Sequence, residues 1–364
     1  MFSTRRRGRP RAAVAGRPKL RIAFAGDFLS GQTEAWLMAH GFDELHRHTD
    51  ALTWKFLPRS TDDHEIAPRD LEGRDALILR GQHVRRQTLT TEVARTLTVV
   101  ARNGSGYDKI DLDACTAAEV LVFNVPEAVT HGTAFGAFVL MAGIARKLVA
   151  LDRIVREGRW DDRHDYIGDE LRYKTLGIVG LGRIGQEVAR LVGPLEMRLL
   201  AYGPRLTPER ARGVDAACVP LDTLLAEADF VCLTCPLTDE TRGLIGAREL
   251  ALMKRTAYLV NVARGEIVDQ TALAAALGAG GIAGAGLDVF AEEPPAPTDP
   301  LLGLENVILN PHFVGYTHDV VRQSAGGTIR GLAAIAAGLI PSHVLNPEVL
   351  DRPGFATKLA RFRG

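Results

Sequence analysis

A glycine-rich turn between an apolar run and a helical pattern constrains the fold of this chain more than any other feature. The apolar run covers residues 176–179, and glycines follow at positions 180, 182 and 185. Gly180 permits a tight strand-to-helix turn, Gly182 lets the backbone approach a pyrophosphate, and Gly185 lets helix and strand pack closely. The start of the next helix offers free N–H groups to the phosphates. We expect the cofactor contacts of this turn to come from Gly180, Gly182, Arg183, Ile184 and Gly185.

The end of the following strand, expected over residues 198–202, bears on the choice of cofactor. An Asp or Glu at this place would hold the ribose 2′-hydroxyl of NAD. This chain has Gly203 there, followed two residues later by Arg205. Without the carboxylate a 2′-phosphate is not repelled, and Arg205 either attracts it or is an ordinary solvated loop residue. The sequence therefore predicts NAD or NADP, with Gly203 and Arg205 at the ribose.

Composition excludes several classes of partner. Lys and Arg number 44 and Asp and Glu also number 44, so we expect neither nucleic acid nor a membrane as partner. Residues 1–19 are basic without an apolar signal core, which favours a disordered tail over a secretion signal, with a transit peptide or an upstream start site as alternatives. No apolar run approaches the ~20 residues that span a bilayer. Four cysteines in 364 residues favour a reducing compartment, so we expect a soluble cytoplasmic protein.

Cys232 and Cys235 form a CxxC pattern that invites a metal or redox interpretation. They lie in an apolar run typical of a buried strand, where positions i and i+3 point to opposite faces. No second Cys or His pair completes a zinc site. We therefore expect structural thiols and no metal.

Apolar runs alternate with helical patterns along the chain, which is typical of a parallel sheet covered on both faces. One long helix is expected over residues 128–150. The pattern predicts an α/β fold of the doubly wound class. The expected strands cover residues 20–26, 76–79, 97–101, 120–123, 198–202, 230–234, 257–261, 283–288 and 306–309.

Polar side chains follow three successive strands of the second half. Arg264 lies just past the strand at 257–261, Glu293 follows the strand at 283–288, and His312 ends the third in Asn-Pro-His. Ligands collect at the carboxyl edge of an open parallel sheet. A guanidinium there matches a carboxylate with two parallel hydrogen bonds. Singly each residue has an ordinary structural explanation, but together they predict a catalytic site.

Taken together, five segments resemble the D-isomer-specific 2-hydroxyacid dehydrogenase family. These are residues 103–111, the glycine-rich turn, the run around Arg264, residues 287–294 and Pro311-His312. The resemblance implies two Rossmann-like domains with parallel sheets. A discontinuous substrate domain would cover 20–125 and 316–350, with a dinucleotide-binding domain inserted at 126–315. It also implies a homodimer formed through the cofactor domains.

The resemblance also implies a role for each site residue. Arg264 would bind the substrate carboxylate and polarise the C2 carbonyl, and His312 would exchange a proton with the C2 oxygen. Glu293 would hydrogen-bond His312 and favour its protonated form, while Asp288 would lie near the nicotinamide carboxamide or serve as a structural acid. Backbone N–H groups would bind the second carboxylate oxygen of the substrate, and the residues that would supply them are Asn103, Gly104, Ser105 and Gly106.

Several functions remain open at this stage. The resemblance fits glyoxylate or hydroxypyruvate reductase and also phosphoglycerate dehydrogenase, although the chain ends soon after Leu350 with no appended regulatory domain expected. A dinucleotide-sensing corepressor of the same fold is an alternative of another class. Departures from the family, such as Thr234 in place of a common histidine and Phe313 after His312, leave the identity of the 2-hydroxy acid open. Its side chain would meet a pocket around residues 80–82.

Overall fold

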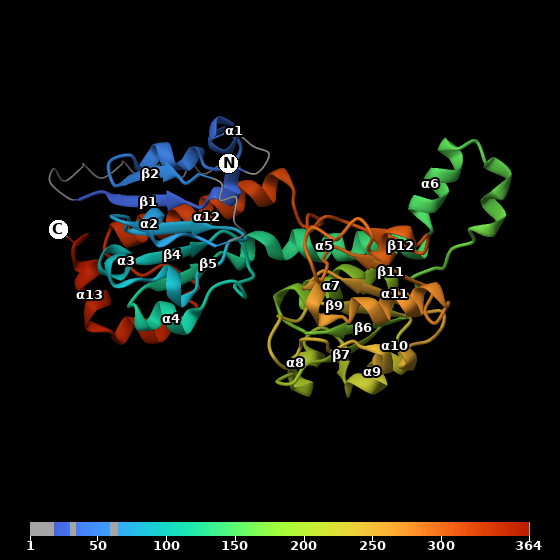
Figure 1. Ribbon diagram of the computed structural model, residues 1–364. Coiled ribbons are helices and arrows are strands. Elements are labelled where there is room, and N and C mark those ends of the chain that lie inside the picture. The colour runs from blue at the N-terminus through green and yellow to red at the C-terminus, as the bar shows by residue number, and fades with distance from the viewer. Residues whose placement is uncertain (1–17, 30–33, 59–64, 364) are drawn as a thin grey trace, which may run out of the picture. The chain divides into compact units, whose positions relative to one another are not determined.

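The computed structural model describes residues 18–29, 34–58 and 65–363 (Figure 1). Most of the basic tail expected over 1–19 therefore lies outside the described residues. The described chain forms two compact units. Unit 1 contains the residues up to Pro126 and from Val321 onward, and unit 2 contains Glu127–Val320.

Unit 1 is built on a five-stranded parallel sheet with the order β2-β1-β3-β4-β5. The chain runs from β1 to β2 on one side and then crosses to β3 on the other, so the strand order reverses between β1 and β3. The strands are β1 (Leu20–Phe24), β2 (Leu52–Phe56), β3 (Ala76–Leu79), β4 (Val99–Arg102) and β5 (Leu121–Asn124). The helices are α1 (Glu34–His40), α2 (Pro68–Leu71), α3 (Thr91–Thr96), α4 (Leu112–Ala117), α12 (His318–Ala336), which begins in unit 2, and α13 (Pro353–Ala360).

Unit 2 is built on a seven-stranded parallel sheet with the order β12-β11-β10-β9-β6-β7-β8. Its order reverses between β6 and β9. The strands are β6 (Thr175–Val179), β7 (Arg198–Tyr202), β8 (Ala216–Cys218), β9 (Phe230–Leu233), β10 (Tyr258–Asn261), β11 (Gly284–Leu287) and β12 (Val307–Leu309). The helices are α5 (Pro126–Ala145, whose first residue belongs to unit 1), α6 (Leu148–Arg156), α7 (Arg183–Val192), α8 (Pro208–Arg212), α9 (Leu221–Glu227), α10 (Ala247–Leu252) and α11 (Gln270–Gly278).

Two hydrophobic cores cover the two faces of the unit 2 sheet. Successive strand residues point to opposite faces, so Ile178 joins the core beneath α5 and α7 while Val179 joins the core beneath α9, α10 and α11. Figure 1 shows α5 on one side of this sheet and α9 and α10 on the other. By length and composition α5 could cross a membrane, and one side of it, which includes Ala137, Leu140 and Met141, packs on the sheet. The predicted doubly wound α/β class is confirmed.

The prediction of a single helix over residues 128–150 is wrong. The structure ends α5 at Ala145 and starts a separate helix, α6, at Leu148, because Lys147 takes a left-handed conformation with φ 53°. The carbonyl oxygen of Ala145 accepts a hydrogen bond from the N–H of Asp169, 2.8 Å away. This contact comes from a distant part of the chain, so the local helical pattern does not reveal it.

Two edge strands, β2 and β8, have no counterpart among the expected strands. Leu52 is the only fully buried residue of β2, and β8 has three residues with one buried. An edge strand that is largely exposed lacks the apolar run that marks a buried one. The sequence therefore gives it little signal.

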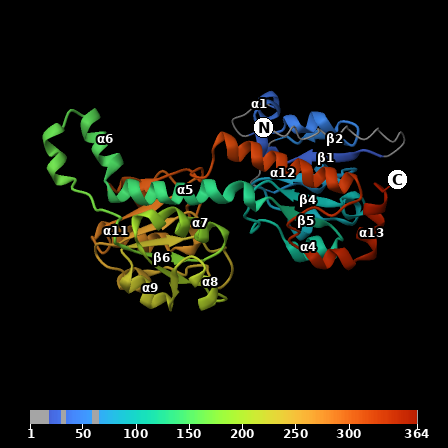
Figure 2. The same cartoon turned by 180° about the vertical axis from the view of Figure 1, so that it is seen from behind.

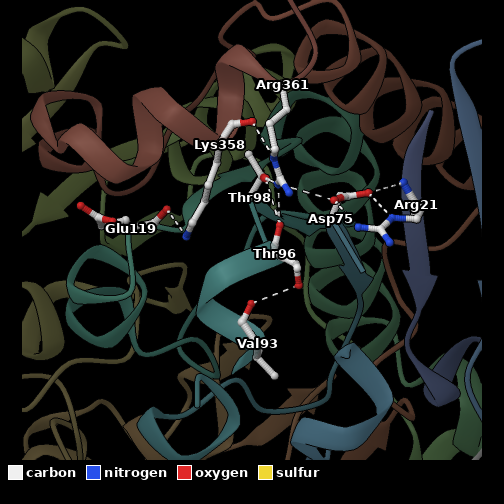
Figure 3. A network of polar contacts seen from close by, with 8 residues as sticks. All are labelled: Arg21, Asp75, Val93, Thr96, Thr98, Glu119, Lys358 and Arg361. Atoms are coloured by element: carbon white, nitrogen blue, oxygen red, sulfur yellow. Dashed lines mark hydrogen bonds and ion pairs between the residues drawn. The ribbon is translucent and has the colours of Figure 1, made fainter. Parts of the chain in front are cut away.

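Helix α13 continues unit 1 past Leu350 and is held by polar contacts (Figure 3). The ammonium group of Lys358 donates to the carbonyl oxygens of Ala118 and Glu119 at 2.9 and 3.0 Å. Arg361 lies 3.5 Å from the buried carboxylate of Asp75, which also pairs with Arg21 at 2.7 Å. These contacts anchor the last helix to the sheet.

Candidate active site

The glycine-rich turn lies where the strand order of unit 2 reverses, between β6 and β9. Gly180 has φ 96°, and a Cβ on it would lie 2.5 Å from the backbone nitrogen of Cys235, beyond β9. A Cβ on Gly185 would lie 2.5 Å from the carbonyl oxygen of Gly180. A Cβ on Gly182 would meet nothing within 4 Å, so the space beside this residue is open. The three glycines thus have the three geometries that the sequence predicts.

The start of α7 completes a cradle that fits a pyrophosphate. Gly182 precedes the helix, and its first turn contains Arg183, Ile184 and Gly185. The N–H groups of a first helical turn have no acceptor within the helix. They and the helix dipole attract an anion to the open space at Gly182. The residues present therefore fit a dinucleotide.

The end of β7 has no carboxylate for a ribose. Gly203 begins a turn in which its carbonyl oxygen accepts from the N–H of Leu206 at 3.0 Å, and Arg205 is exposed on that turn. The pKa of Glu240 lies below its usual value because its carboxylate accepts hydrogen bonds from Thr238 and from its own N–H, with a smaller attraction from Arg205. The Arg205 charge is therefore available at this surface but partly balanced by Glu240.

Backbone hydrogen bonds extend the sheet beyond the ends of β10, β11 and β12. The N–H of Asp288 donates to the carbonyl oxygen of Asn261 at 2.9 Å, and the N–H of His312 donates to that of Asp288 at 2.7 Å. Beside them, the N–H of Asn310 donates to the carbonyl oxygen of Leu287 at 2.8 Å. The segments that carry the predicted side chains are thus fixed to one another.

His312 and Glu293 form a hydrogen-bonded pair on this edge. The Nδ1 atom of His312 lies 2.9 Å from Oε2 and 3.1 Å from Oε1 of Glu293. Oε1 of Glu293 also accepts from the N–H of Phe290 at 3.2 Å, which orients the carboxylate. A carboxylate partner assigns the hydrogen to Nδ1, since the carboxylate can only accept. Nε2 is then the ring nitrogen that can exchange a proton with a ligand.

Asp288 makes the contacts of a structural acid. It is 4% exposed, and its Oδ1 atom accepts from the N–H groups of Phe313 and Val314 at 2.8 and 2.9 Å. Burial raises the pKa of this carboxyl group, against the opposing effects of those two N–H groups and of His312. Its carboxylate therefore holds the chain as it leaves His312, and the contact with a nicotinamide carboxamide stays a prediction.

Arg264 directly precedes a short 3-10 helix, Gly265–Ile267, after β10. The side chain of Asn261 bridges this corner, donating to the carbonyl oxygen of Arg264 at 2.9 Å and accepting from the N–H of Ala263 at 3.0 Å. A Cβ on Gly265 would lie 1.9 Å from the carbonyl carbon of Phe290, so only glycine allows this approach. The loop of Arg264 therefore rests against the segment that leads to Glu293. Sequence reasoning did not single out Asn261 or Gly265, although both lie in the motif around Arg264.

The predicted substrate loop, 103–106, follows β4 in unit 1 and turns its carbonyl oxygens inward. Arg102 donates to the carbonyl oxygens of Asn103 and, at 2.6 Å, Gly106, while the side chain of Asn124 donates to that of Ser105 at 2.7 Å. The carbonyl oxygen of Gly104 accepts from the N–H of Val125 at 3.1 Å.

The carbonyl groups of the 103–106 loop accept hydrogen bonds, but some of its backbone N–H groups donate none. Within the described part of the chain, the N–H groups of Ser105 and Gly106 have no hydrogen-bond acceptor. Gly104 has φ 142°, a conformation that favours glycine. The N–H groups of Asn103 and Gly104 already donate to the carbonyl oxygens of Leu79 at 2.9 Å and Arg102 at 3.0 Å, so the expectation that these two would serve a ligand is wrong. For Ser105 and Gly106 the role as N–H donors stays a prediction. The sequence did not reveal that Arg102 and Asn124 hold the loop in this form.

The two cysteines of the CxxC pattern are free thiols. Burial raises the pKa of Cys232 to about 12 and that of Cys235 to about 11. A thiol with so high a pKa is a poor nucleophile and metal ligand. Among the residues that the structure describes, no group of three or more His, Cys, Asp or Glu side chains is placed to hold a metal ion.

Comparison with known proteins gives consistent matches. A family model described as "D-isomer specific 2-hydroxyacid dehydrogenase, NAD binding domain" matches residues 138–314. The chain is 45% identical over 269 residues to a glyoxylate reductase of Korarchaeum cryptofilum, covering 72% of this chain and 81% of that relative. It is 42% identical over 287 residues to a D-3-phosphoglycerate dehydrogenase of Archaeoglobus fulgidus, covering 79% of this chain and 54% of that relative. A crystal structure of a glyoxylate reductase from Paecilomyes thermophila has a TM-score of 0.77 at 29% identity, over 90% of this chain and 98% of that one.

Proposed function

Because the chain belongs to the D-isomer-specific 2-hydroxyacid dehydrogenase family, we propose that it reduces glyoxylate and similar small 2-oxo acids. It is an oxidoreductase that uses NAD or NADP to transfer hydride between a 2-hydroxy acid and its 2-oxo acid. The observation that carries the proposal is the pair of His312 and Glu293 on strand ends that backbone hydrogen bonds fix together. Glyoxylate is chosen because relatives named glyoxylate reductase align with most of this chain.

The proton transfer is assigned to His312. When bound, the nicotinamide cofactor supplies the hydride that reaches C2 of the substrate. His312 donates its Nε2 proton to the C2 oxygen during reduction and takes it back in the reverse direction. Glu293 stabilises the charged imidazolium through Nδ1 and keeps the ring oriented. A positioned acid–base group contributes typically ~10²–10⁴-fold in rate.

The substrate carboxylate is assigned to donors from both parts of the sequence. Arg264 supplies a guanidinium whose forked donors match one edge of a carboxylate and also polarise the C2 carbonyl. The N–H groups of Ser105 and Gly106 supply the hydrogen bonds for the other carboxylate oxygen. Charge-assisted hydrogen bonds of this kind are about twice as strong as neutral ones.

The experiment is a substrate panel followed by nicotinamide absorbance. Initial rates with NADH and NADPH are compared for glyoxylate, hydroxypyruvate, pyruvate, phenylpyruvate and 3-phosphohydroxypyruvate. We expect the highest kcat/KM for glyoxylate or hydroxypyruvate. Preference for 3-phosphohydroxypyruvate would instead favour the phosphoglycerate dehydrogenase function of the Archaeoglobus relative. Tight cofactor binding with no turnover of any 2-oxo acid would contradict the proposal.

We also propose a homodimer formed through unit 2. Apolar side chains on α5 and α6 are unusually exposed: Phe135 is 49% exposed and Leu148 is 62% exposed, and Val139, Val149 and Val155 are each about half exposed. Figures 1 and 2 both show α6 projecting from the rest of unit 2. Exposed apolar patches mark interaction surfaces. The molar mass by light scattering should be that of a dimer and should fall to that of a monomer when Leu148 and Val149 are both replaced by Asp; a monomeric wild type would contradict this proposal.

A cytoplasmic location is proposed from the cysteines. All four are free thiols in the structure. Free thiols persist in reducing compartments, whereas secreted proteins form disulfides. Fractionation of cells that express the chain tests this location.

A further inference from the structure

A carboxylate outside the assigned catalytic groups lies at the reversal point of the unit 1 sheet. Asp27 follows β1 in a short 3-10 helix, Gly26–Leu29. Its Oδ2 atom accepts hydrogen bonds from three consecutive N–H groups after β3, those of Arg80 at 3.2 Å, Gly81 at 2.6 Å and Gln82 at 3.2 Å. The reversal point of an open parallel sheet is where ligands bind. Asp27 therefore holds the backbone of residues 80–82 by hydrogen bonds at the edge of the unit 1 sheet where ligands are expected.

Side chains of the 80–82 loop also contact the segment that contains Asp27. The side chain of Gln82, which is 6% exposed, accepts from the N–H of Asp27 at 3.4 Å. The guanidinium carbon of Arg80 lies 4.3 Å from the ring centroid of Phe28, next to Asp27 in sequence. Backbone and side chains of the 80–82 loop are thus both fastened to the segment after β1.

The 80–82 loop lies beside the proposed substrate loop. Leu79 pairs with Arg102 in the register of β3 and β4, and the N–H of Asn103 donates to the carbonyl oxygen of Leu79 at 2.9 Å. Farther along, the N–H of Val84 donates to the carbonyl oxygen of Lys109 at 3.0 Å. A displacement of residues 80–82 should therefore also displace Asn103 and Lys109, which lie on either side of Ser105 and Gly106.

Stability alone explains this arrangement poorly. Oδ1 of Asp27 and Nε of Arg80 are buried and have no hydrogen-bond partner among the described residues. Unpaired buried polar atoms cost free energy and call for an explanation other than packing. A role of Asp27 in fixing the 80–82 loop accounts for the free energy that these two unpaired atoms cost.

We propose that Asp27 is a positioning residue for substrate binding, whose carboxylate holds the 80–82 loop against the 103–106 loop. The inference rests on the proposed function, because the 103–106 loop matters here as the donor of N–H groups to the substrate carboxylate. Asp27 acts through the backbone and takes no part in the proton transfer. Its loss should therefore affect KM for the 2-oxo acid and leave kcat and cofactor binding nearly unchanged.

The test compares steady-state kinetics of glyoxylate reduction in three variants of the full chain. Asp27→Ala removes the acceptor and should raise KM ~10- to 100-fold, since small misplacements of binding groups are costly. Asp27→Asn keeps an acceptor oxygen but loses the charge, so its KM should lie between those of Asp27→Ala and the wild type. Asp111→Ala is the matched control, because this carboxylate also accepts a backbone N–H in unit 1, at the start of α4, without touching the 80–82 loop.

The dissociation constant for NADH, measured by fluorescence, should be the same in all three variants. An unchanged KM in Asp27→Ala, or an equal rise in Asp111→Ala, would mean that Asp27 has only a structural role. If Asp27→Ala does not fold, an unchanged KM in Asp27→Asn overturns the inference by itself. A wild type that reduces no 2-oxo acid would contradict the proposed function and this role with it, whereas normal wild-type turnover with unaffected variants would contradict the role of Asp27 alone.

Discussion

The two parallel sheets of this protein both carry proposed functional groups at strand ends, but the groups consist of different atoms. At the edge of unit 2 the groups are side chains, Arg264, Glu293 and His312, on a backbone fixed by hydrogen bonds between strand ends. At the edge of unit 1 the groups are backbone N–H atoms of Ser105 and Gly106, and the side chains point inward to hold the loop.

This difference corresponds to two contributions to the proposed reaction, proton transfer and substrate binding. His312 can move a proton and Glu293 supports it, so the loss of either at the unit 2 edge should act on kcat, whereas the loss of Arg264, which is assigned to the substrate carboxylate, should act on KM as well. Backbone donors can only bind, so changes at the unit 1 edge should act on KM. An interaction made equally in ground state and transition state changes KM without changing kcat.

The largest effect is expected at the unit 2 edge. His312→Asn removes the proton donor and should lower kcat by ~10²–10⁴-fold while the dissociation constant of NADH is unchanged. The matched control is His131→Asn, because His131 also places Nδ1 2.9 Å from a glutamate, Glu187, but lies on helix α5 and follows no strand of the unit 2 sheet. Normal turnover in His312→Asn, or an equal loss in His131→Asn, would remove the catalytic role from the unit 2 edge.

An intermediate effect is expected at the unit 1 edge. Arg102→Met removes the donors that hold the carbonyl oxygens of Asn103 and Gly106. The loosened loop should raise KM for glyoxylate on the order of tenfold, equivalent to about 1.4 kcal/mol, with kcat nearly unchanged. Arg95→Met, an exposed arginine of the same unit, serves as control. A fall in kcat at constant KM would contradict the assignment of the 103–106 loop to binding.

A smaller effect is expected at the ribose end of the cofactor site. Arg205→Ala should lower kcat/KM for NADPH by no more than about fivefold, because an exposed charge contributes roughly 0–1 kcal/mol. The value for NADH should not change. Gly203→Asp should act more strongly in the same direction, since the new carboxylate repels a 2′-phosphate. Unchanged values with both cofactors in Arg205→Ala would show that Arg205 is an ordinary loop residue, and equal losses with both would show that it does not recognise the 2′-phosphate.

The last effect concerns stability rather than kinetics and lies away from both edges. Burial lowers the pKa of Lys358 to about 8, against 10.5 for an unburied lysine. Between these values the unfolded chain holds a proton that the folded chain has released, so raising the pH favours the folded state by at most about 1.4 kcal/mol per pH unit. Below pH 8 both states are charged and this contribution is constant.

Lys358→Met should remove this rise in stability. Denaturant unfolding at several pH values above and below the pKa of Lys358 measures it as the difference in slope between wild type and variant. Lys55→Met, a change of an exposed lysine in the same unit, should keep the wild-type slope. Identical slopes in wild type and Lys358→Met would contradict the shifted pKa.

The sequence predicts the architecture well where the apolar signal is strong. The strands at 76–79 and 198–202 match β3 and β7, because buried parallel strands consist mostly of apolar residues. The exposed edge strands β2 and β8 are not predicted from the sequence. Helix α5 ends at Ala145, whose carbonyl oxygen accepts a hydrogen bond from Asp169 that only the folded chain reveals.

The same limit applies to the site. His312, Glu293 and Arg264 can be found because parallel strands bring successive strand ends to one edge. The side chains that hold the loops, such as Arg102, Asn124 and Asp27, form hydrogen bonds with backbone atoms, and a backbone partner leaves no residue type to recognise in the sequence. Their roles therefore appear only in the structure.

The most direct test of the division between the two edges is to measure kcat and KM for glyoxylate side by side in His312→Asn and Arg102→Met. The account predicts a fall in kcat at nearly constant KM for the first and a rise in KM at nearly constant kcat for the second. If both variants change the same parameter, the two edges do not divide catalysis and binding in the way proposed.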